Sequence, residues 1–261
     1  MIQAPRVVQL SDPHLVGPLA GRVRSKPALA HWEAALDQAM ALQPDLLLIT
    51  GDCCQDESWN GYARLRDSLK RLPQTTQVAV APGNHDHPGR LRCCLGAGVT
   101  VAPAVVRMRS WDVILLSSHW SGHTGGRIGT QQRRWLRSWA IKAHKTERSL
   151  LLALHHPPIA IGNQDWDAIG LEDRNALIVE LQQLPQLRGV VFGHLHQHWQ
   201  GTLTSRTDVR LLGCPSTLCA FPAIQPCPLG RCHQPGGRLM ELNASGDLGE
   251  TLLRWAEPTD I

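Results

Sequence analysis

The sequence predicts an α/β fold, because short apolar runs alternate with longer amphipathic segments along most of the chain. The apolar runs are rich in Val, Leu and Ile and have the length expected of strands buried inside a sheet. The amphipathic segments repeat apolar residues at spacings of three and four, which places these residues on one helix face. Five of the apolar runs lead directly into His, Asp or Asn side chains. The sequence therefore predicts a sheet covered by helices, with polar residues gathered at one edge.

Predicted strands and helices alternate over the first three quarters of the chain. We expect strands at residues 6–10, 45–50, 77–81, 113–117, 149–154 and 189–192, and helices at 27–42, 57–72, 130–144 and 172–184. The core face of the first helix includes Trp32, Leu36 and Ala39. After about residue 203 the pattern changes to strands, which we expect at 209–212, 237–242 and 248–255. We predict a single domain over residues 1–261 whose C-terminal part, from about residue 203, is rich in β-structure.

Charge and composition indicate no macromolecular partner. The 26 Lys and Arg against 22 Asp and Glu leave a net charge of +4, without the clustered cations of a nucleic-acid groove or a membrane-binding surface. No run approaches the roughly 18 to 20 apolar residues of a membrane helix, and residues 1–6 do not resemble an export signal. We therefore expect a cytoplasmic protein. Because cytosolic thiols stay reduced, its eight cysteines are expected to be free, as small buried or partly buried thiols.

Metal-binding side chains follow five of the predicted strands, at the point where each strand ends. They are Asp12 and His14 after the first strand, Asp52 after the second, Asn84, His85 and Asp86 after the third, His155 and His156 after the fifth, and His194 and His196 after the sixth. In α/β sheets the carboxyl ends of the strands form the crevice where ligands bind, so these residues can converge. Histidine nitrogens with Asp and Asn oxygens suit Mn, Fe, Zn, Co or Ni. Seven good donors are enough for two ions roughly 3.5 to 4 Å apart.

These five blocks stand in the order and at the spacings of a known signature. Asp12-x-His14, Gly51-Asp52, Gly83-Asn84-His85-Asp86, His155-x-Pro157 and Gly193-His194-x-His196 resemble the motifs of the calcineurin-like metallophosphoesterases. Asp56 and residues 127–131, 169–172, 215–217 and 235–238 resemble the bacterial 3′,5′-cyclic AMP phosphodiesterase branch, the class III cyclic-nucleotide phosphodiesterases. The resemblance covers nearly the whole chain.

The resemblance implies a fold and a set of roles. The implied fold is a four-layer α/β arrangement, a central β-sandwich of two mixed sheets flanked by helices. By resemblance, Asp12, His14 and His196 hold one metal ion, Asn84, His155 and His194 hold the second, and Asp52 bridges both. His85 is expected to bind the substrate together with Asn84 and to donate to the phosphate or protonate the leaving alkoxide, with Asp86 orienting the His85 ring. Because the family pattern is His-x-Pro, His155 rather than His156 is the expected ligand.

The implied activity is the hydrolysis of 3′,5′-cyclic AMP, and of other cyclic nucleotides, to the 5′-monophosphate through a metal-bridged hydroxide. Two divalent or trivalent ions such as Fe, Mn or Zn are the expected cofactors. A small phosphodiester is the expected partner, with no nucleic-acid polymer and no membrane. The alternative is a broad hydrolase of small phosphodiesters, such as glycerophosphodiesters, or of phosphomonoesters. A non-enzymatic scaffold is disfavoured because every ligand position is filled, and a nuclease because the chain has no basic stripe.

Some residues near the predicted site have two interpretations. His119 and His123 follow the fourth strand and either line the substrate mouth or are solvated, and Trp120, Trp166 and Trp199 either stack on a base or belong to the core and its rim. The cysteines within residues 214–232 are spaced more widely than in a typical zinc knuckle. The segment from residue 203 onwards either makes a homodimer contact or covers the active site.

Overall fold

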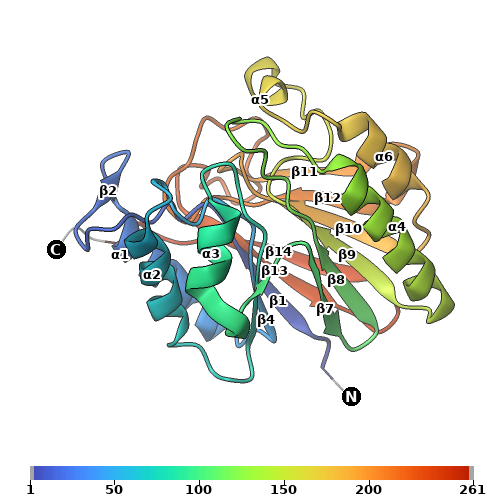
Figure 1. Cartoon of the computed structure of the whole chain (residues 1–261), viewed down its shortest axis with the longest axis horizontal. Coiled ribbons are helices and arrows are strands. Elements are labelled where there is room, and N and C mark those ends of the chain that lie inside the picture. Colours follow the sequence, from blue (N-terminus) through green and yellow to red (C-terminus); the bar gives the residue numbers. More distant parts are fainter. Residues whose placement is uncertain (1–2, 259–261) are drawn as a thin grey trace.

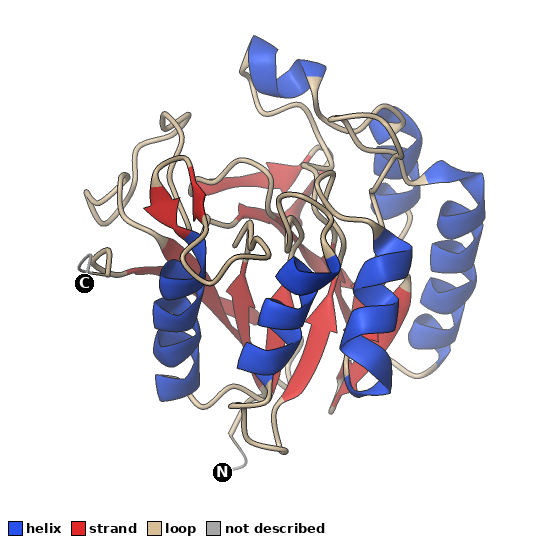
Figure 2. Ribbon diagram, turned by 60° about the vertical axis from the view of Figure 1, so that its left-hand side comes forward, coloured by secondary structure: helices blue, strands red, loops and turns tan. Residues whose placement is uncertain are grey.

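Two six-stranded sheets face each other at the centre of the protein, and helices cover the outer face of each sheet (Figures 1 and 2). The computed structural model describes residues 3–258, so residues 1–2 and 259–261 of the predicted domain lie outside it. On one side lie α1 (Ala28–Ala41), α2 (Trp59–Leu69) and α3 (Pro88–Leu95), and on the other lie α4 (Gly129–Lys145) and α6 (Arg174–Gln182). The predicted four-layer α/β arrangement is confirmed. None of the helices within residues 3–258 is long and apolar enough to cross a membrane.

The first sheet has the strand order β14-β13-β1-β4-β5-β6. Its strands are β1 (Arg6–Leu10), β4 (Leu46–Ile49), β5 (Gln77–Val80), β6 (Thr100–Val101), β13 (Gly236–Leu242) and β14 (Leu248–Arg254). In this sheet β1, β4, β5 and β6 are parallel to one another. On the other side of β1, β13 pairs antiparallel with β1, and β14 pairs antiparallel with β13. The parallel pairing brings the loops after β1, β4 and β5 to the same edge of the sheet.

The second sheet has the strand order β11-β12-β10-β9-β8-β7. Its strands are β7 (Ala104–Met108), β8 (Trp111–Leu115), β9 (Ser149–Ala153), β10 (Leu187–Phe192), β11 (Trp199–Leu203) and β12 (Arg206–Gly213). The four inner strands are parallel, and β7 and β11 are the antiparallel outer strands. The loops after β9 and β10 therefore end at one edge of this sheet, as the loops after β1, β4 and β5 do in the first.

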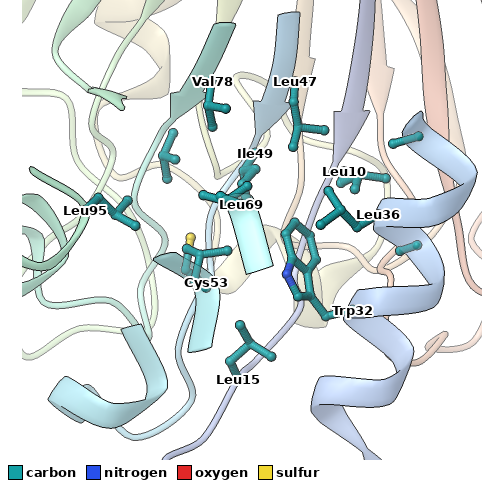
Figure 3. Packing of buried hydrophobic residues seen from close by; sticks show 14 of the residues in the cluster. Leu10, Leu15, Trp32, Leu36, Leu47, Ile49, Cys53, Leu69, Val78 and Leu95 are labelled. Atoms are coloured by element: carbon teal, nitrogen blue, oxygen red, sulfur yellow. The ribbon is translucent and has the colours of Figure 1, made fainter. Parts of the chain in front are cut away.

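Both sheets are buried on both faces, which explains why their strands have continuous apolar sequences. One apolar cluster fills the space between the sheets, and two others join the sheets to the helices on either side. Figure 3 shows Trp32 and Leu36 of α1 directed toward Leu10 and Leu47 of the first sheet. The buried Trp32 indole N–H donates to the Ser68 hydroxyl at 2.7 Å, so its polar atom is satisfied.

The predicted helices and strands are all present, with ends shifted by a few residues. The strand expected at 113–117 begins earlier, at Trp111, because it forms a hairpin with β7. The sequence did not predict β7, β11, α3, the short helix α5 (Gln164–Ala168) or the hairpin of β2 (Arg22–Val23) and β3 (Lys26–Pro27). The sequence of α3 begins Pro-Gly and has weak helix propensity, so burial of Leu91 and Leu95 stabilises it instead.

A buried cation joins the two sheets. Arg238 of β13 is fully buried, and its guanidinium donates to the Gly213 carbonyl at 3.0 Å and to Nδ1 of His198 at 2.8 Å. It also forms an ion pair with Glu250 of β14 at 2.6 Å. Burial and the neighbouring Arg238 charge lower the pKa of His198 to about 4, so the imidazole is neutral and accepts this bond. The network fastens the antiparallel edge of the first sheet to the second sheet.

We predict that Arg238→Met destabilises the protein by about 3 to 5 kcal/mol, because it leaves buried partners without their cation. The free energy of unfolding in urea measures this loss. Arg210→Met is the matched control, since Arg210 pairs with the same Glu250 at 2.8 Å but its side chain is 36% exposed. That variant should cost about 0 to 1 kcal/mol. Equal losses in the two variants would contradict the prediction.

Candidate metal centre

Backbone hydrogen bonds join the loops after β1 and β4 and continue the pairing of these strands. The Asp12 N–H donates to the Gly51 carbonyl at 3.0 Å, and the His14 N–H donates to the Asp52 carbonyl at 2.9 Å. Five of the seven expected ligands have a positive φ: Asp12 (54°), His14 (46°), Asp52 (48°), His194 (67°) and His196 (55°). This left-handed conformation costs a non-glycine residue roughly 1 to 3 kcal/mol. The fold therefore holds most of the expected ligands in a conformation that local preferences oppose.

One group of buried donors consists of Asp12, His14, Asp52 and His196, whose ligand atoms all lie within 4.8 Å of one another. The Nε2 atoms of His14 and His196 are 3.0 Å apart. This is about the separation of two nitrogens that bind one ion at about 2.1 Å and at right angles. The Nδ1 atom of His196 lies 3.0 Å from the Cys219 carbonyl, which requires an N–H at Nδ1 and leaves the Nε2 lone pair for a metal.

A second group is centred on His155. Its Nδ1–H donates to the Thr50 carbonyl at 2.7 Å, so Nε2 is the nitrogen that faces the other donors and that a metal ion would bind in place of a proton. This Nε2 lies 3.1 Å from Oδ1 of Asn84, 3.2 Å from Nδ1 of His194 and 3.5 Å from Oδ2 of Asp52. Ligand atoms from four side chains therefore face one another at distances suited to a shared cation.

His156 lies beside this second group but has no free ring nitrogen. Its Nδ1 lies 2.8 Å from the Ser118 hydroxyl, and its Nε2 lies 3.0 Å from the Thr124 carbonyl. Its ring lies close enough to His155 and His194 for the three side chains to be a candidate metal-binding group by distance alone. The hydrogen bonds favour His155 as the ligand and give His156 the role of fixing two loops.

Burial determines the protonation of the buried histidines. It lowers the pKa of His14 to about 4 and holds the pKa values of His194 and His196 well below their usual range, so these rings stay neutral. Burial also lowers the pKa of His155, but the nearby carboxylates outweigh this effect and raise it to about 9. Burial opposes ionisation of Asp52, yet the His155 charge holds the pKa of that carboxyl well below its usual range. The pocket thus offers neutral nitrogens and favours positive charge.

The donor set fits a pair of metal ions. Oδ2 of Asp12 is buried, and it has no hydrogen-bond partner within the described residues. Buried polar atoms nearly always have a partner, and carboxylate oxygens and imidazole nitrogens are common metal ligands. With four imidazoles, two carboxylates and one amide oxygen, the two groups can hold ions of the Mn, Fe or Zn type, with Asp52 facing both groups.

Asp86 has a different position from the one expected, and the prediction that it orients the His85 ring is wrong. Its buried carboxylate accepts backbone N–H bonds from Gly83 at 2.9 Å and from Cys53 and Cys54 at 3.1 Å each. Within residues 3–258, no hydrogen bond joins the Asp86 side chain to the His85 ring. Three backbone donors engage both carboxylate oxygens, so Asp86 fastens the loop after β5 to the loop after β4.

Gln55 contacts the His85 ring instead, with its Nε2 3.2 Å from Nδ1 of His85. An amide N–H donated to Nδ1 places the ring proton on Nε2, where it is available to a substrate. The backbone N–H of His85 donates to Oδ1 of Asp52 at 2.9 Å, so His85 is tied to the carboxylate that both metal groups share. A glutamine in a loop carries no sequence signal of this kind, and sequence analysis did not identify it.

Two glycines are required by the geometry of these loops. Gly51 has a φ of 98°, and a Cβ there would lie 2.3 Å from Nδ1 of His155. Gly83 has no positive φ, but a Cβ there would lie 2.1 Å from Oδ1 of Asp52. A glycine at each position lets the backbone approach the ligands closely.

The two donor groups form the floor of a cavity of about 370 Å³. Its rim comes from loops and from the short elements β2 and α5, with Val23, Arg24, Gln55, Thr124, Trp166, Ile169 and Phe221. Phe221 belongs to the segment after residue 203, and its ring centre lies 4.3 Å from that of His196. Of the two roles left open for this segment, covering the site is therefore the one that the structure supports.

The other residues with two interpretations lie at different distances from the cavity. His119 lies close to the site, with Nδ1 3.0 Å from the Gly83 carbonyl. His123 stacks on Trp120, with ring centres 3.5 Å apart, beside a neighbouring hollow. Trp199 is buried in β11 against Phe192, so it is a core residue.

Comparisons with known proteins agree with this geometry. The family model described as calcineurin-like phosphoesterase matches residues 5–198. A protein of Synechococcus sp. (strain WH7803) named "Probable cyclic nucleotide phosphodiesterase" is 48% identical over 97% of each chain. The 3′,5′-cyclic adenosine monophosphate phosphodiesterase CpdA of Pseudomonas aeruginosa is 34% identical, over 93% of this chain and 87% of its own. A dimetal phosphatase structure from Danio rerio superposes with a TM-score of 0.63 over 98% of both chains, at 12% identity, and so shows a shared fold.

We predict that His155→Ala lowers the metal content from about two ions per chain to about one, because it removes a nitrogen of the second group. Metal content after reconstitution and desalting is measured by atomic emission. His156→Gln is the matched control and should retain about two ions, since neither ring nitrogen of His156 is free. Loss of metal in the His156 variant but not in the His155 variant would reverse the assignment.

Proposed function

The chain belongs to the calcineurin-like phosphoesterase family, and on this premise we propose that it is a metal-dependent phosphodiesterase that hydrolyses 3′,5′-cyclic AMP to 5′-AMP. The observation that carries the proposal is the pair of donor groups on the cavity floor, with Asp52 facing both and His85 beside them. The relatives named as cyclic-nucleotide phosphodiesterases support the choice of substrate, since the chain matches them over nearly their whole length.

We assign the ligands as the resemblance implies. Asp12, His14 and His196 are proposed for one ion, Asn84, His155 and His194 for the other, and Asp52 for both. When bound, such a pair supplies an activated water near neutral pH and neutralises charge on the phosphate. Mn, Fe and Zn all suit this set of nitrogen and oxygen donors.

The protein's own groups orient the substrate and move a proton. Asn84 and His85 line the cavity beside the donor groups, where they can contact phosphate oxygens. With Gln55 donating to its Nδ1, His85 presents an N–H at Nε2 toward the cavity. We propose that this N–H donates to the phosphate and then to the leaving 3′ oxygen, which is a poor leaving group unless it is protonated.

A broad hydrolase of small phosphodiesters or phosphomonoesters is the second candidate, because the donor groups act on the phosphate and not on the base. Eight free thiols among the described residues are consistent with a reducing compartment, and we propose a cytoplasmic location. Every residue that lines the cavity belongs to one chain, so the proposed activity does not require a homodimer.

The first experiment is hydrolysis of cyclic AMP and of bis(p-nitrophenyl) phosphate after reconstitution with Mn²⁺. Both should be cleaved, and chelation should abolish the activity. Asp52→Ala and Asn84→Ala should lose more than about 100-fold of the rate, because each removes a proposed metal ligand. Cleavage of the artificial diester alone would refute cyclic AMP as the substrate, and an inactive wild-type protein with every metal tested would refute the enzyme.

We further predict that His85→Ala lowers kcat for cyclic AMP by about 10² to 10⁴, whereas bis(p-nitrophenyl) phosphate loses much less. The p-nitrophenolate departs without protonation, so it does not need the proton of His85.

Gln55→Ala should show the same substrate dependence at about 10 to 100-fold, since it acts through the orientation of His85. Asp86→Asn replaces one acceptor oxygen with an NH2 group that cannot accept a backbone N–H, so it loosens the loop without touching Gln55 and serves as the comparison for loop disorder. A loss in Gln55→Ala that is equal for both substrates would argue against orientation of His85.

A further inference from the structure

The rim of the cavity contains one permanent cation, Arg24, that no acidic side chain among residues 3–258 neutralises. Arg24 is the only Arg or Lys among the residues that line the cavity. No ion pair within residues 3–258 involves it, although the next basic residue in its hairpin, Lys26, pairs with Glu257. An unpaired guanidinium beside a nucleotide-sized cavity is available to a ligand.

Arg24 does not point freely into solvent but lies on an aromatic ring. Its guanidinium carbon is 4.6 Å from the centre of the Phe221 ring. Phe221 in turn contacts His196 at 4.3 Å and Trp166 at 5.4 Å between ring centres. The rings thus form a continuous series from His196, a proposed metal ligand, to Arg24. Phe221 covers one face of the guanidinium, while Arg24 as a whole remains exposed.

The hairpin that carries Arg24 is held in a strained turn. Arg24 and Ser25, the two residues between β2 and β3, have φ values of 50° and 64°. Two-residue hairpin turns of this kind favour Asn-Gly, because glycine and asparagine tolerate a positive φ. The Arg22 guanidinium donates to the Ser25 carbonyl at 2.7 Å and closes the turn. Backbone strain of this kind is common at functional sites, and Figure 1 shows the hairpin as a projection beside α1.

We propose that Arg24, supported from beneath by Phe221, is the platform on which the nucleobase of the substrate stacks, and that it selects base-containing phosphodiesters. This inference rests on the proposed function. Guanidinium planes stack on nucleobases and on aromatic rings, so Arg24 would lie between Phe221 and the base. In a cyclic nucleotide the ribose ring lies between the phosphate and the base. In the cavity the Phe221 ring lies between the proposed metal ligand His196 and Arg24, so the two spacings correspond. A phosphate on the floor therefore directs the base toward Arg24.

The neighbouring hollow that Trp120 and His123 line offers a competing platform. There Trp120 stacks on His123 at 3.5 Å, and Arg127 lies 5.8 Å from the Trp120 ring. Arg127 differs from Arg24 in being paired, since Glu172 lies 3.5 Å away. Neither Trp120 nor Arg127 lines the cavity above the metal donors. The unpaired cation on the lining surface is thus the better platform, and Arg127 provides a matched control.

The experiment compares two substrates that share the reacting ring. One is cyclic AMP, and the other is the 3′,5′-cyclic phosphate of methyl riboside, which has no base. Base stacking contributes about 1 to 3 kcal/mol, which corresponds to about 5- to 150-fold in affinity. Arg24→Met should therefore raise the KM for cyclic AMP at least about five-fold more than the KM for the base-free substrate. Arg127→Met should leave the ratio of the two KM values within about two-fold of the wild type.

Two further variants separate stacking from charge. Arg24→Lys keeps the charge but lacks the plane, so it should resemble Arg24→Met. Phe221→Leu removes the aromatic support, and combined with Arg24→Met it should add little to the single change, because the two side chains act as one unit.

A KM for cyclic AMP that is unchanged in Arg24→Met, or restored by lysine, or raised equally for the base-free substrate would overturn the platform. A selective effect of Arg127→Met in its place would move the base to the neighbouring hollow beside Trp120 and also overturn the proposal. If the wild-type protein cleaves the base-free substrate but not cyclic AMP, the proposed function fails and this inference fails with it. Wild-type cleavage of cyclic AMP with an unchanged ratio in Arg24→Met leaves the function intact and rejects only the platform.

Discussion

The Asp52 carboxylate lies between the two groups of metal donors, and the arrangement of the cavity floor depends on its position. Oδ1 accepts the backbone N–H of His85 at 2.9 Å, while Oδ2 faces His14 at 3.7 Å and His155 at 3.5 Å. These three partners follow three different strands of the two sheets, β5, β1 and β9, and Asp52 itself follows a fourth strand, β4. One carboxylate can face all of them only because the parallel strands end at the same edge, and because Gly83 leaves room beside Oδ1.

The backbone accepts strain to maintain this convergence. Most of the expected ligands have positive φ values, and the loops that carry them are tied together by backbone bonds, by the three amides on Asp86 and by the ring of His156. The strain persists because the surrounding bonds over-determine it. Residues beside the ligands, such as Asp86 and His156, therefore matter for the chemistry through geometry, although their polar atoms are already engaged within the protein.

The cavity floor could be predicted from the sequence for a physical reason. A buried parallel strand has a continuous apolar sequence, its end is marked by the first polar residues, and parallel topology places such ends together. Asp12, Asp52 and His194 were therefore recognisable from their neighbours alone. The family resemblance implied that Asp86 orients the His85 ring, whereas its carboxylate turns toward backbone amides of another loop, a contact that no local pattern indicates. Gln55 was missed because its contact with His85 crosses 30 residues.

The rim of the cavity follows different rules from the floor. Arg24 lies in a two-residue hairpin turn and Phe221 in a loop without regular structure, and neither belongs to a periodic pattern. Their contact joins residues almost 200 positions apart, so no local preference indicates it. The floor of the cavity binds a phosphate, which every phosphoester contains. The residues of the floor are positioned by the strands of the fold. Discrimination among phosphoesters requires contacts to the remainder of the substrate, and in this protein those contacts can come only from the loops. Chemistry and specificity are thus encoded in separate parts of the chain, and a change of substrate needs no change in the strands that position the metal donors.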